Sequence, residues 1–144
     1  MNGEEQNRTR VLFLCTGNSC RSQMAEGWLR HLAGDRFDVS SAGTNPVGLN
    51  PNAVEAMGEV GIDISRQRSK HLEEFAGRRF DYVITVCDRA KESCPTYPWA
   101  GSLLHWSFDD PAAAKGSPKK RQTVFRRVRN EIEGRIRRFV GSCC

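Results

Sequence analysis

An apolar run that leads directly into a polar loop and then into a helical pattern restricts the fold of this chain more than any other segment. Residues 11–14, VLFL, form a short continuous run bounded by a turn signal, which is typical of a buried strand. From Ser22 onward, Met24, Trp28 and Leu32 recur every four residues and predict a helix. A strand, a tight loop and a helix N-terminus together build a concave ring of backbone N–H groups. The segment therefore predicts a site for a tetrahedral oxyanion.

The loop at residues 15–22, CTGNSCRS, contains a nucleophile and an anion ligand. A helix N-terminus and a nearby guanidinium lower the pKa of a thiol from about 8.5 to roughly 3.5–7.5. We therefore expect Cys15 to be a thiolate at neutral pH and to act as the nucleophile. The planar fork of donors on Arg21 matches two oxygens of phosphate or arsenate. The other interpretation is a simple strand-to-helix turn with two incidental cysteines.

Backbone geometry explains the other residues of the loop. Gly17 lets the backbone turn closely around an anion, and Asn18 tolerates left-handed geometry. Ser22 can donate a hydrogen bond to the Cys15 thiolate and can also begin the helix. The residues that we expect to surround the anion are Thr16, Gly17, Asn18, Ser19, Cys20, Arg21 and Ser22.

Strands and helices alternate along the rest of the chain. Such alternation is typical of a single α/β domain, here a three-layer sandwich in which helices cover both faces of a parallel sheet. We expect strands at about 10–15, 37–41, 81–86 and 103–108, and helices at about 21–33, from Asn50-Pro51, at 71–76 and at 118–140. The domain then spans residues 10–140, between a disordered lead-in at 1–9 and a short tail at 141–144.

Chemically distinctive side chains follow three of the predicted strands. Cys15, Cys87 and the pair Asp109-Asp110 each come after a strand. Ligands of open parallel sheets bind beyond the carboxyl ends of the strands, so we expect these groups to converge. Displacement of an oxygen needs a proton donor, and Asp110, next to Pro111, is a candidate general acid. An ordinary turn or helix cap explains the aspartate pair equally well.

Cys87 and Cys94 lie seven residues apart around a polar segment. A phosphatase needs no further thiol, whereas a reductase must pass two electrons out through disulfide formation. Cys87 could attack Cys15, and Cys94 could then attack Cys87 and carry the oxidation outward. Two structural cysteines, or a zinc site that also includes Cys20, are the alternatives. The spacings of five and seven are unlike those of zinc knuckles, so no metal site is predicted.

Composition limits the compartment and the function of the cysteines. The chain has 144 residues and six cysteines. Residues 1–9 are polar and do not resemble a signal peptide, and no apolar run approaches the ~18 residues of a membrane span. We therefore expect a cytoplasmic protein without a membrane partner. In such a reducing compartment, cysteines serve catalysis, redox chemistry or metal binding rather than a disulfide framework.

The net charge of +5 is concentrated near the C-terminus, where residues 119–138 contain nine Lys and Arg. A surface for nucleic acid or an acidic partner is one interpretation. The other is the solvated face of a terminal helix with a buried apolar side. The apolar positions, at spacings of three or four, are Phe125, Val128, Ile132, Ile136 and Phe139. Two glutamates interrupt the positive charge, so we favour the second interpretation and expect no nucleic-acid partner.

The chain resembles the thioredoxin-coupled arsenate reductases built on the low-molecular-weight tyrosine phosphatase fold. The similarity covers about residues 10–140. The matching stretches are residues 15–28, Ser41-Ala42-Gly43, Asp63-Ile64-Ser65, Val86-Cys87, Cys94-Pro95, His105-Trp106 and Phe108-Asp109-Asp110-Pro111. The resemblance implies a four-stranded parallel sheet with the oxyanion loop after the first strand. It also implies five roles: Cys15 as nucleophile, Arg21 as anion ligand, Asp110 as acid, and Cys87 and Cys94 as a disulfide-forming relay.

One position departs from the pattern of the family. Some relatives bind a potassium ion beside the loop, with residues that match Asn18, Glu26 and Ser41 together with an acidic residue. The acidic position falls on Lys70 here, whose charge repels a cation. We therefore expect no bound metal and no dependence of activity on potassium.

Three further cysteines have no role that the resemblance assigns. Cys143 and Cys144 end the chain, where an extra redox relay and a frayed tail are both compatible with the sequence. Cys20 is compatible with a spectator, a modulator of Cys15 or a protective disulfide partner. The terminal pair also leaves the electron donor open between thioredoxin, glutaredoxin and another thiol.

The residues and the resemblance together predict an enzyme that reduces arsenate to arsenite. We expect thioredoxin as the reductant, no bound cofactor, phosphate as a competing anion, and a monomer. A low-molecular-weight protein tyrosine phosphatase is the alternative, although residues 112–116, AAAKG, offer no aromatic ring to stack on phosphotyrosine. A non-catalytic module that binds anions or nucleic acid through the basic helix is a third hypothesis.

Overall fold

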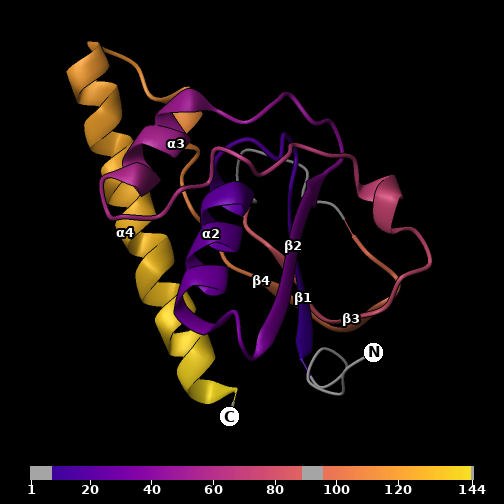
Figure 1. Cartoon of the computed structure of the whole chain (residues 1–144). Coiled ribbons are helices and arrows are strands. Elements are labelled where there is room, and N and C mark those ends of the chain that lie inside the picture. Colours follow the sequence, from indigo (N-terminus) through magenta and orange to yellow (C-terminus); the bar gives the residue numbers. More distant parts are fainter. Residues whose placement is uncertain (1–7, 89–95, 144) are drawn as a thin grey trace.

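A computed structural model describes residues 8–88 and 96–143 of this chain and contains a four-stranded sheet in the order β2-β1-β3-β4 (Figure 1). The strands are β1 (Thr9–Cys15), β2 (Phe37–Gly43), β3 (Phe80–Thr85) and β4 (Ala100–His105). The helices are α2 (Arg21–Ala33), α3 (Pro51–Gly58) and α4 (Pro118–Ser142), with short 3-10 helices η1 (Leu72–Phe75) and η2 (Pro111–Ala113). All described strand pairs are parallel, so the carboxyl ends of the strands meet at one edge of the sheet.

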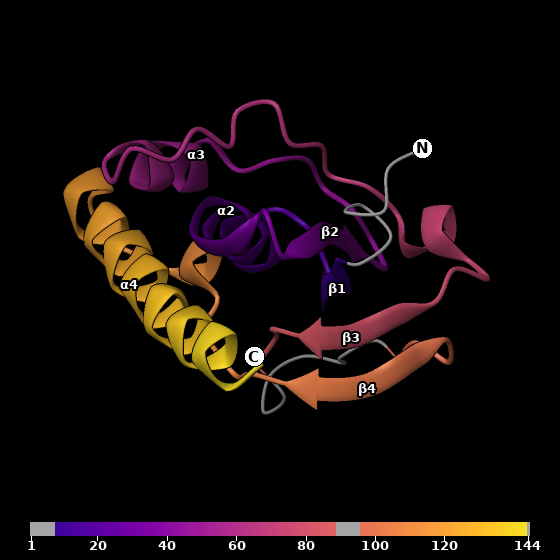
Figure 2. The same ribbon diagram turned by 60° about the horizontal axis from the view of Figure 1, so that its bottom comes forward.

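Both faces of the sheet are covered, which confirms the predicted α/β class. On one face α2 packs on β1 and β2, and α3 and α4 pack against α2. Figure 2 shows α2 and α4 on one side of the sheet and η1 on the other. Phe13 and Trp28 belong to the larger core on the helix side, whereas Leu14 and Phe75 belong to a smaller core on the side of η1. Because β1 is buried on both faces, its residues 11–14 are continuously apolar.

Local sequence signals explain where two helices begin. The Asn50 side chain accepts a hydrogen bond from the backbone of Asn52 at 2.8 Å, directly before the proline that opens α3. Ser117 accepts one from the backbone of Lys120 at 3.2 Å, directly before the proline that opens α4. Such caps contribute about 0.5–2 kcal/mol each, and a proline in the first turn has no N–H group to leave unsatisfied.

The last strand lies three residues earlier than the sequence indicated. We expected it at 103–108, but β4 spans Ala100–His105. Leu103, the first residue of the expected strand, is 49% exposed on β4. Trp106 and Phe108 are buried beyond its end, where Trp106 packs against aromatic rings of the larger core. The apolar residues at 103–108 therefore belong partly to the buried loop after β4 and do not define the bounds of the strand.

Two boundaries at the ends of the domain also need correction. β1 already includes Thr9, within the segment 1–9 that we expected to be disordered; residues 1–7 lie outside the described part. α4 continues through Ser142 into the expected tail at 141–144. Gly and Ser are weak helix formers, so the sequence suggested an earlier end, but here they extend a helix whose apolar side is already packed.

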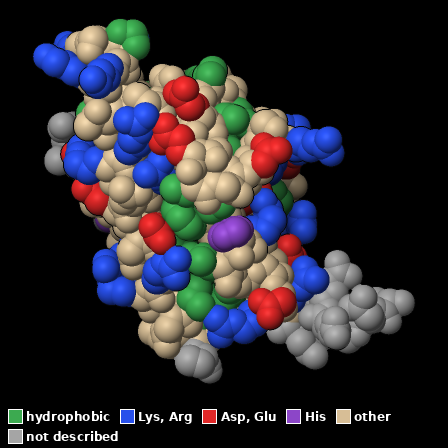
Figure 3. All heavy atoms as spheres, turned by 60° about the vertical axis from the view of Figure 1, so that its left-hand side comes forward, with side chains coloured by type: hydrophobic (Ala, Val, Ile, Leu, Met, Phe, Trp, Pro, Cys, Tyr) green, Lys and Arg blue, Asp and Glu red, His purple; other side chains and the backbone are tan. Residues whose placement is uncertain are grey.

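α4 carries the basic residues over a buried apolar side. Phe125, Ile132 and Phe139 are buried, as predicted. The exposed Arg126 and the buried Arg129 both bind Glu59, at 2.8 and 2.9 Å. Figure 3 shows acidic side chains among the Lys and Arg of the surface. Packing and ion pairing thus explain the composition of α4. Among the described helices, α4 included, none is long and apolar enough to span a membrane.

Candidate active site

The loop between β1 and α2 is held from outside by hydrogen bonds to its carbonyl groups. Three backbone N–H groups of the segment 45–50 donate to it at 2.9–3.1 Å: Asn45 to Thr16, Val47 to Gly17, and Asn50 to Ser19. The side chain of Gln23 donates to the carbonyl of Asn18 at 3.0 Å. When the carbonyl groups of a loop point outward, its N–H groups can point into the concave side. The N–H of Asn18 does so and lies 3.3 Å from the Cys15 sulfur. The predicted loop is thus an amide-lined cup.

Two backbone positions make this close turn feasible. Asn18 has a φ of 46°, the only positive value at a non-glycine residue in the described parts of the chain, as the sequence predicted. Gly43 ends β2 against the loop, where a Cβ atom would lie 2.4 Å from the carbonyl oxygen of Thr16. A side chain at position 43 would therefore push the loop away from the sheet.

Cys15 is the last residue of β1 and is buried inside the cup. Its sulfur lies 2.8 Å from the hydroxyl oxygen of Ser22, which accepts a hydrogen bond from Asn18 Nδ2 at 2.9 Å. Because Asn18 supplies a hydrogen to Ser22, the hydroxyl hydrogen of Ser22 is available for the sulfur, as we predicted. The second role predicted for Ser22, the helix cap, is wrong: Cys20 occupies the cap position without a side-chain bond, and the Ser22 hydroxyl is committed to Cys15.

Arg21 and Asp110 face one another across the mouth of the cup. Arg21 is buried, donates from Nη1 to the carbonyl of Phe108 at 3.2 Å, and places Nη2 3.8 Å from Asp110 Oδ2. The other oxygen of Asp110 accepts the N–H of Ala112 at 3.0 Å and caps η2. The two interpretations of Asp110 are therefore compatible, since one oxygen caps the turn and the other faces the cup.

Cys20 lies in the cup and is buried. Burial raises the pKa of the Cys20 thiol to about 12, so this thiol is neutral at pH 7. It is also free of any disulfide. Of the three roles left open by the sequence, these observations favour the spectator.

Cys87 reaches the same edge of the sheet as Cys15. The residue before it, Val86, donates its N–H to the carbonyl of Leu14 at 2.9 Å, so the chain beyond β3 still runs beside the end of β1. Cys87 is fully buried and disulfide-bonded, whereas Cys15, Cys20 and Cys143 are free. Cys94, the third thiol of the predicted relay, lies outside the described residues.

Cys143 lies at the opposite edge of the sheet. A hydrogen bond with Cys143 is the main reason that the pKa of Tyr82 is raised, and Tyr82 pairs with Val11. Cys15 is four residues further along β1, or about 13 Å at the usual rise of a strand. Figure 1 places the C-terminal end at the bottom of the view, where the strands begin. Cys143 therefore cannot exchange directly with the thiols of the cup.

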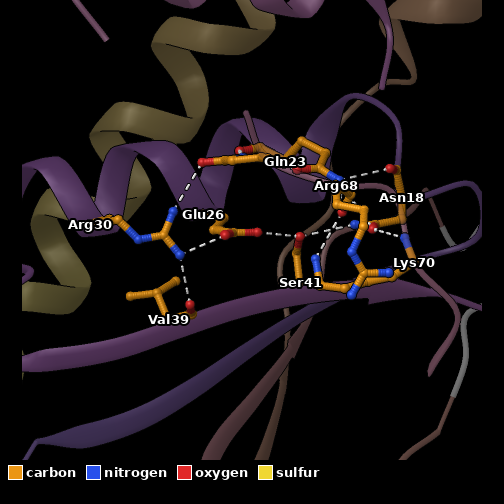
Figure 4. A network of polar contacts seen from close by, with 9 residues as sticks. Asn18, Gln23, Glu26, Arg30, Val39, Ser41, Arg68 and Lys70 are labelled. Atoms are coloured by element: carbon orange, nitrogen blue, oxygen red, sulfur yellow. Dashed lines mark hydrogen bonds and ion pairs between the residues drawn. The ribbon is translucent and has the colours of Figure 1, made fainter. Parts of the chain in front are cut away.

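The loop is also braced from the side of α2 and β2 (Figure 4). Asn18 donates to Ser41 at 3.0 Å, Ser41 donates to Glu26 at 2.5 Å, and Arg30 binds Glu26 at 2.6 Å. The backbone N–H of Lys70 donates to Asn18 Oδ1 at 2.9 Å. One hydrogen-bond network thus includes all four positions that the sequence analysis compared with a potassium site, which are Asn18, Glu26, Ser41 and Lys70.

The donor chemistry of these residues does not fit a cation. Asn18 turns its amide hydrogens toward Ser41, and its oxygen already accepts the N–H of Lys70. Lys70 also places an ammonium group beside this network, at the position where the resemblance implies a carboxylate. Among the described residues, no group of three or more His, Cys, Asp or Glu is arranged to hold a metal ion. Independence from potassium stays a prediction.

Sequence reasoning missed several residues that shape the site. Gln23 bridges Asn18 and the carbonyl of Arg68, and Gln67 donates to both oxygens of Gln23. The segment 45–50 donates three backbone hydrogen bonds to the carbonyls of the cup, and the sequence predicted no role for it. Apart from the bond between Gln23 and Asn18, these contacts join positions far apart in the chain, so no local spacing signals them.

Comparisons with known proteins agree with this geometry. A model of the family described as low molecular weight phosphotyrosine protein phosphatase matches residues 10–143. An arsenate reductase of Halalkalibacterium halodurans is 51% identical over 133 residues, which are 92% of this chain and 96% of the relative. A solved structure of an arsenate reductase in the phosphate binding state has a TM-score of 0.80 at 33% identity and covers 94% of this chain and 99% of its own. A thioredoxin-dependent arsenate reductase of Corynebacterium glutamicum has a TM-score of 0.71 at 33% identity and covers 94% of this chain and 61% of its own.

A thiol in an amide-lined cup, faced by a guanidinium and a carboxylate at the carboxyl edge of a parallel sheet, defines a class of α/β enzymes that act on tetrahedral oxyanions. The chain belongs to the low molecular weight phosphotyrosine protein phosphatase family. Within this family it is similar to arsenate reductases in both sequence and structure, which confirms the resemblance drawn from its motifs.

Proposed function

We propose that this protein reduces arsenate to arsenite, with Cys15 as nucleophile and with Cys87 and Cys94 as a disulfide relay. One observation carries the proposal: a free thiol lies in the cup while Cys87, at the same edge of the sheet, is disulfide-bonded. A phosphatase has no use for a second redox-active sulfur beside its nucleophile. The names of the compared relatives support the same assignment.

In the first step, the Cys15 thiolate attacks the arsenic atom of bound arsenate and forms a sulfur–arsenic bond. One arsenate oxygen leaves as water after it receives a proton from Asp110, which faces the mouth of the cup. Arg21 and the loop N–H groups hold the negative charge of the remaining oxygens. The hydroxyl of Ser22 stabilises the thiolate before the attack.

In the second step, the Cys87 thiolate attacks the sulfur of Cys15. The sulfur–arsenic bond breaks, its electron pair goes to arsenic, and arsenite leaves while a Cys15–Cys87 disulfide forms. Cys94 then attacks Cys87 and releases Cys15 as a thiolate. The resulting Cys87–Cys94 disulfide takes two electrons from an external dithiol. The role of Cys94 rests on the sequence and the resemblance alone.

Thioredoxin is the external dithiol that we propose, because one of the compared structures is a thioredoxin-dependent arsenate reductase. Phosphate competes for the cup, since it has the same tetrahedral shape and charge as arsenate, and one compared enzyme was solved in a phosphate binding state. No bound cofactor is needed, because the relay moves both electrons through sulfur. We also propose a monomeric, cytoplasmic enzyme.

Serine variants of the relay test this mechanism in a single turnover with arsenate and no reductant. Cys94→Ser should form one arsenite per protein and stop with a Cys15–Cys87 disulfide, mapped by mass spectrometry. Cys87→Ser should form no arsenite, because nothing attacks the sulfur–arsenic adduct. Cys143→Ser is the matched control and should turn over like the unmodified chain, since this thiol lies at the far edge. Sustained turnover of Cys94→Ser with thioredoxin would contradict the relay.

The same preparations separate reduction from phosphate hydrolysis. We expect weak hydrolysis of an aryl phosphate, because the cup also fits phosphate, and we expect Cys94→Ser to leave that rate unchanged. Rapid hydrolysis together with no arsenate turnover in the presence of thioredoxin would instead establish the phosphatase alternative.

A further inference from the structure

A hollow of about 600 Å³ lies between α4 and the chain that follows β4. Figure 2 shows the chain beyond β4 running toward the C-terminal half of α4. The hollow, which we call the α4 hollow, has the volume of a typical small-molecule site, and none of its lining residues belongs to the cup. The lining consists of residues 105–108 on one side and of Asn130, Glu131, Gly134, Arg135 and Arg138 on the other.

Gly134 leaves space in the wall of the hollow although the backbone does not require a glycine there. It lies inside the 25-residue helix α4 and is not among the glycines with a positive φ. A Cβ atom at this position would meet only Arg138 Nη1, at the ordinary contact distance of 3.8 Å. Glycine is also the least favourable residue in a helix interior after proline. Neither backbone strain nor close packing explains this glycine, and its effect in the structure is to keep the hollow open.

Two guanidinium groups lie at the hollow without a carboxylate partner. Four other arginines of α4 bind carboxylates at 2.8–3.1 Å. Within the described part of the chain, Arg135 and Arg138 form no such pair. The guanidinium of Arg135 instead lies over the ring of the buried Trp106, 4.5 Å from its centroid. Burial, and then the like charge of Arg138, lower the pKa of Arg135, so the two groups are close enough to repel one another.

The polar groups beside the two guanidiniums are mainly hydrogen-bond donors. Asn130 Oδ1 accepts from Arg129 Nε at 2.9 Å, so the amide hydrogens of Asn130 remain for another partner. The buried indole N–H of Trp106 has no hydrogen-bond partner among the described residues, which points to an acceptor from outside the chain. The carboxylate of Glu131 is already bound to Arg127 at 3.0 Å. The hollow therefore has an excess of positive charge and of donors.

We propose that the α4 hollow binds a phosphate dianion, with Arg135 and Arg138 as its ligands and Asn130 as a further donor. Two guanidinium groups match a dianion in charge, and their planar donors match pairs of phosphate oxygens. The bound dianion also removes the repulsion between the two arginines. Because the site is a hollow with Glu131 in its wall, it suits a small ligand rather than an extended polyanion. The site is separate from the cup and does not depend on the proposed arsenate chemistry.

A nuclear magnetic resonance titration of the ¹⁵N-labelled full chain tests this site, with sodium phosphate compared against sodium chloride of equal ionic strength. The amide of Gly134 and the indole N–H of Trp106 report on the hollow, and the amide of Gly17 reports on the cup. We expect both sets of signals to shift saturably, with two different dissociation constants. Sodium acetate should bind in the hollow at least about tenfold more weakly than phosphate, because a monoanion leaves one guanidinium without a partner.

Arginine variants assign the signals to the hollow. Arg135→Gln and Arg138→Gln should each weaken phosphate binding at Gly134 about ten- to a hundredfold, since each removes a charged hydrogen-bond donor. The dissociation constant measured at Gly17 should stay the same. Arg137→Gln is the matched control, because this exposed arginine of α4 binds Glu133 and does not line the hollow. The control should bind phosphate in the hollow as tightly as the unmodified chain.

A second kind of variant fills the hollow and keeps both arginines. Gly134→Leu places a bulky side chain in the open space and a good helix former in α4. We expect the phosphate-dependent shift of Trp106 to disappear while the melting temperature stays equal to that of the unmodified chain or rises. Loss of binding in a chain that is no less stable separates occupation of the hollow from damage to the fold.

Glycerol 2-phosphate distinguishes the two sources of a phosphate group. It is compared with inorganic phosphate on the Cys15→Ser chain, which has no thiol in the cup to attack the ester. A higher affinity of the hollow for the ester assigns the site to a small organic phosphate, and an equal or lower affinity assigns it to the free anion.

Three results would overturn the proposal. The first is that Gly134 and Trp106 do not shift at phosphate concentrations that saturate Gly17. The second is that the signals of the hollow follow the dissociation constant of Gly17 in every variant, because the shifts then originate in the cup. The third is an affinity for acetate equal to that for phosphate, which would remove the pairing of two guanidiniums with a dianion.

Discussion

The inner and outer sides of the oxyanion cup are held in different ways. On the inner side, Asn18, Ser41 and Glu26 are buried and joined by hydrogen bonds of 2.5–3.0 Å. On the outer side, Arg21 and Asp110 approach only to 3.8 Å, and the Asp110 side chain is 38% exposed. The inner side has buried hydrogen bonds of fixed direction, whereas the outer side has a long ion pair that solvent can reach.

The difference matches what each side has to do in the proposed reaction. The nucleophile must be held in one orientation before substrate arrives, and buried directional hydrogen bonds provide such preorganisation. The general acid must exchange a proton with water and change partners when the anion binds, and a rigid buried pair would prevent that exchange. The inner side should therefore contribute to stability and activity, and the outer side mainly to activity.

Asp110→Asn should have the largest effect. The amide keeps the shape of the carboxyl group and can still cap η2, but it cannot deliver a proton, so kcat for arsenate should fall about 10²–10⁴-fold. The melting temperature should change by no more than about 2 °C, because the lost ion pair is long and partly exposed. A large drop in melting temperature would show that the outer side is as rigid as the inner one.

Asn18→Ala should lower the free energy of unfolding by about 2–4 kcal/mol. The substitution removes hydrogen-bond partners of the Lys70 N–H and of the Ser22 and Ser41 hydroxyls. It also places alanine at a positive φ. Urea unfolding measures the loss. Asn52→Ala, at an exposed position of α3, is the matched control and should change the free energy by less than about 0.5 kcal/mol. Equal losses for the two variants would remove the contrast between the sides of the cup.

Glu59→Gln should have the smallest effect and shows what an ion pair contributes away from the cup. Hydrogen bonds from Arg126, and then from Arg129, lower the pKa of Glu59 below its usual value of 4.5. This contribution to stability is complete above pH 4.5 and is lost as the pH falls through the lowered pKa. At pH 7 the variant should lose at most about 1 kcal/mol, because solvent screens the pair, and the difference should disappear in acid. A difference that grows toward acid would contradict the sign of the shift.

The sequence predicted the parts of the fold that depend on local patterns. β1 and α2 were predictable because one is continuously apolar and the other has a regular apolar repeat. The position of β4 was not, because an edge strand with exposed Leu103 lacks a clear pattern, while the strongest apolar signal belongs to Trp106 in the following loop. Edge strands are specified by their one neighbour and by the loop packed beyond them, which single-sequence spacing does not reveal.

The candidate site was predictable to the extent that it is contiguous in the chain. The motif itself indicated the cup, Cys15 and Arg21, and the left-handed Asn18 followed from residue type. The hydrogen bonds that orient the cup come from Gln23, Glu26, Lys70 and the segment 45–50. Their roles depend on donor direction and burial, which exist only after the chain has folded.

Cys143 offers a practical consequence of the distance between the two edges of the sheet. This residue is partly accessible, free of disulfides and separated from the cup by the length of the strands. A fluorophore or an electrode linker attached there would report on the enzyme without blocking substrate entry. Its hydrogen-bond partner Tyr82 belongs to β3, the strand that precedes Cys87, so a probe attached at Cys143 would lie beside the strand that leads to the proposed relay.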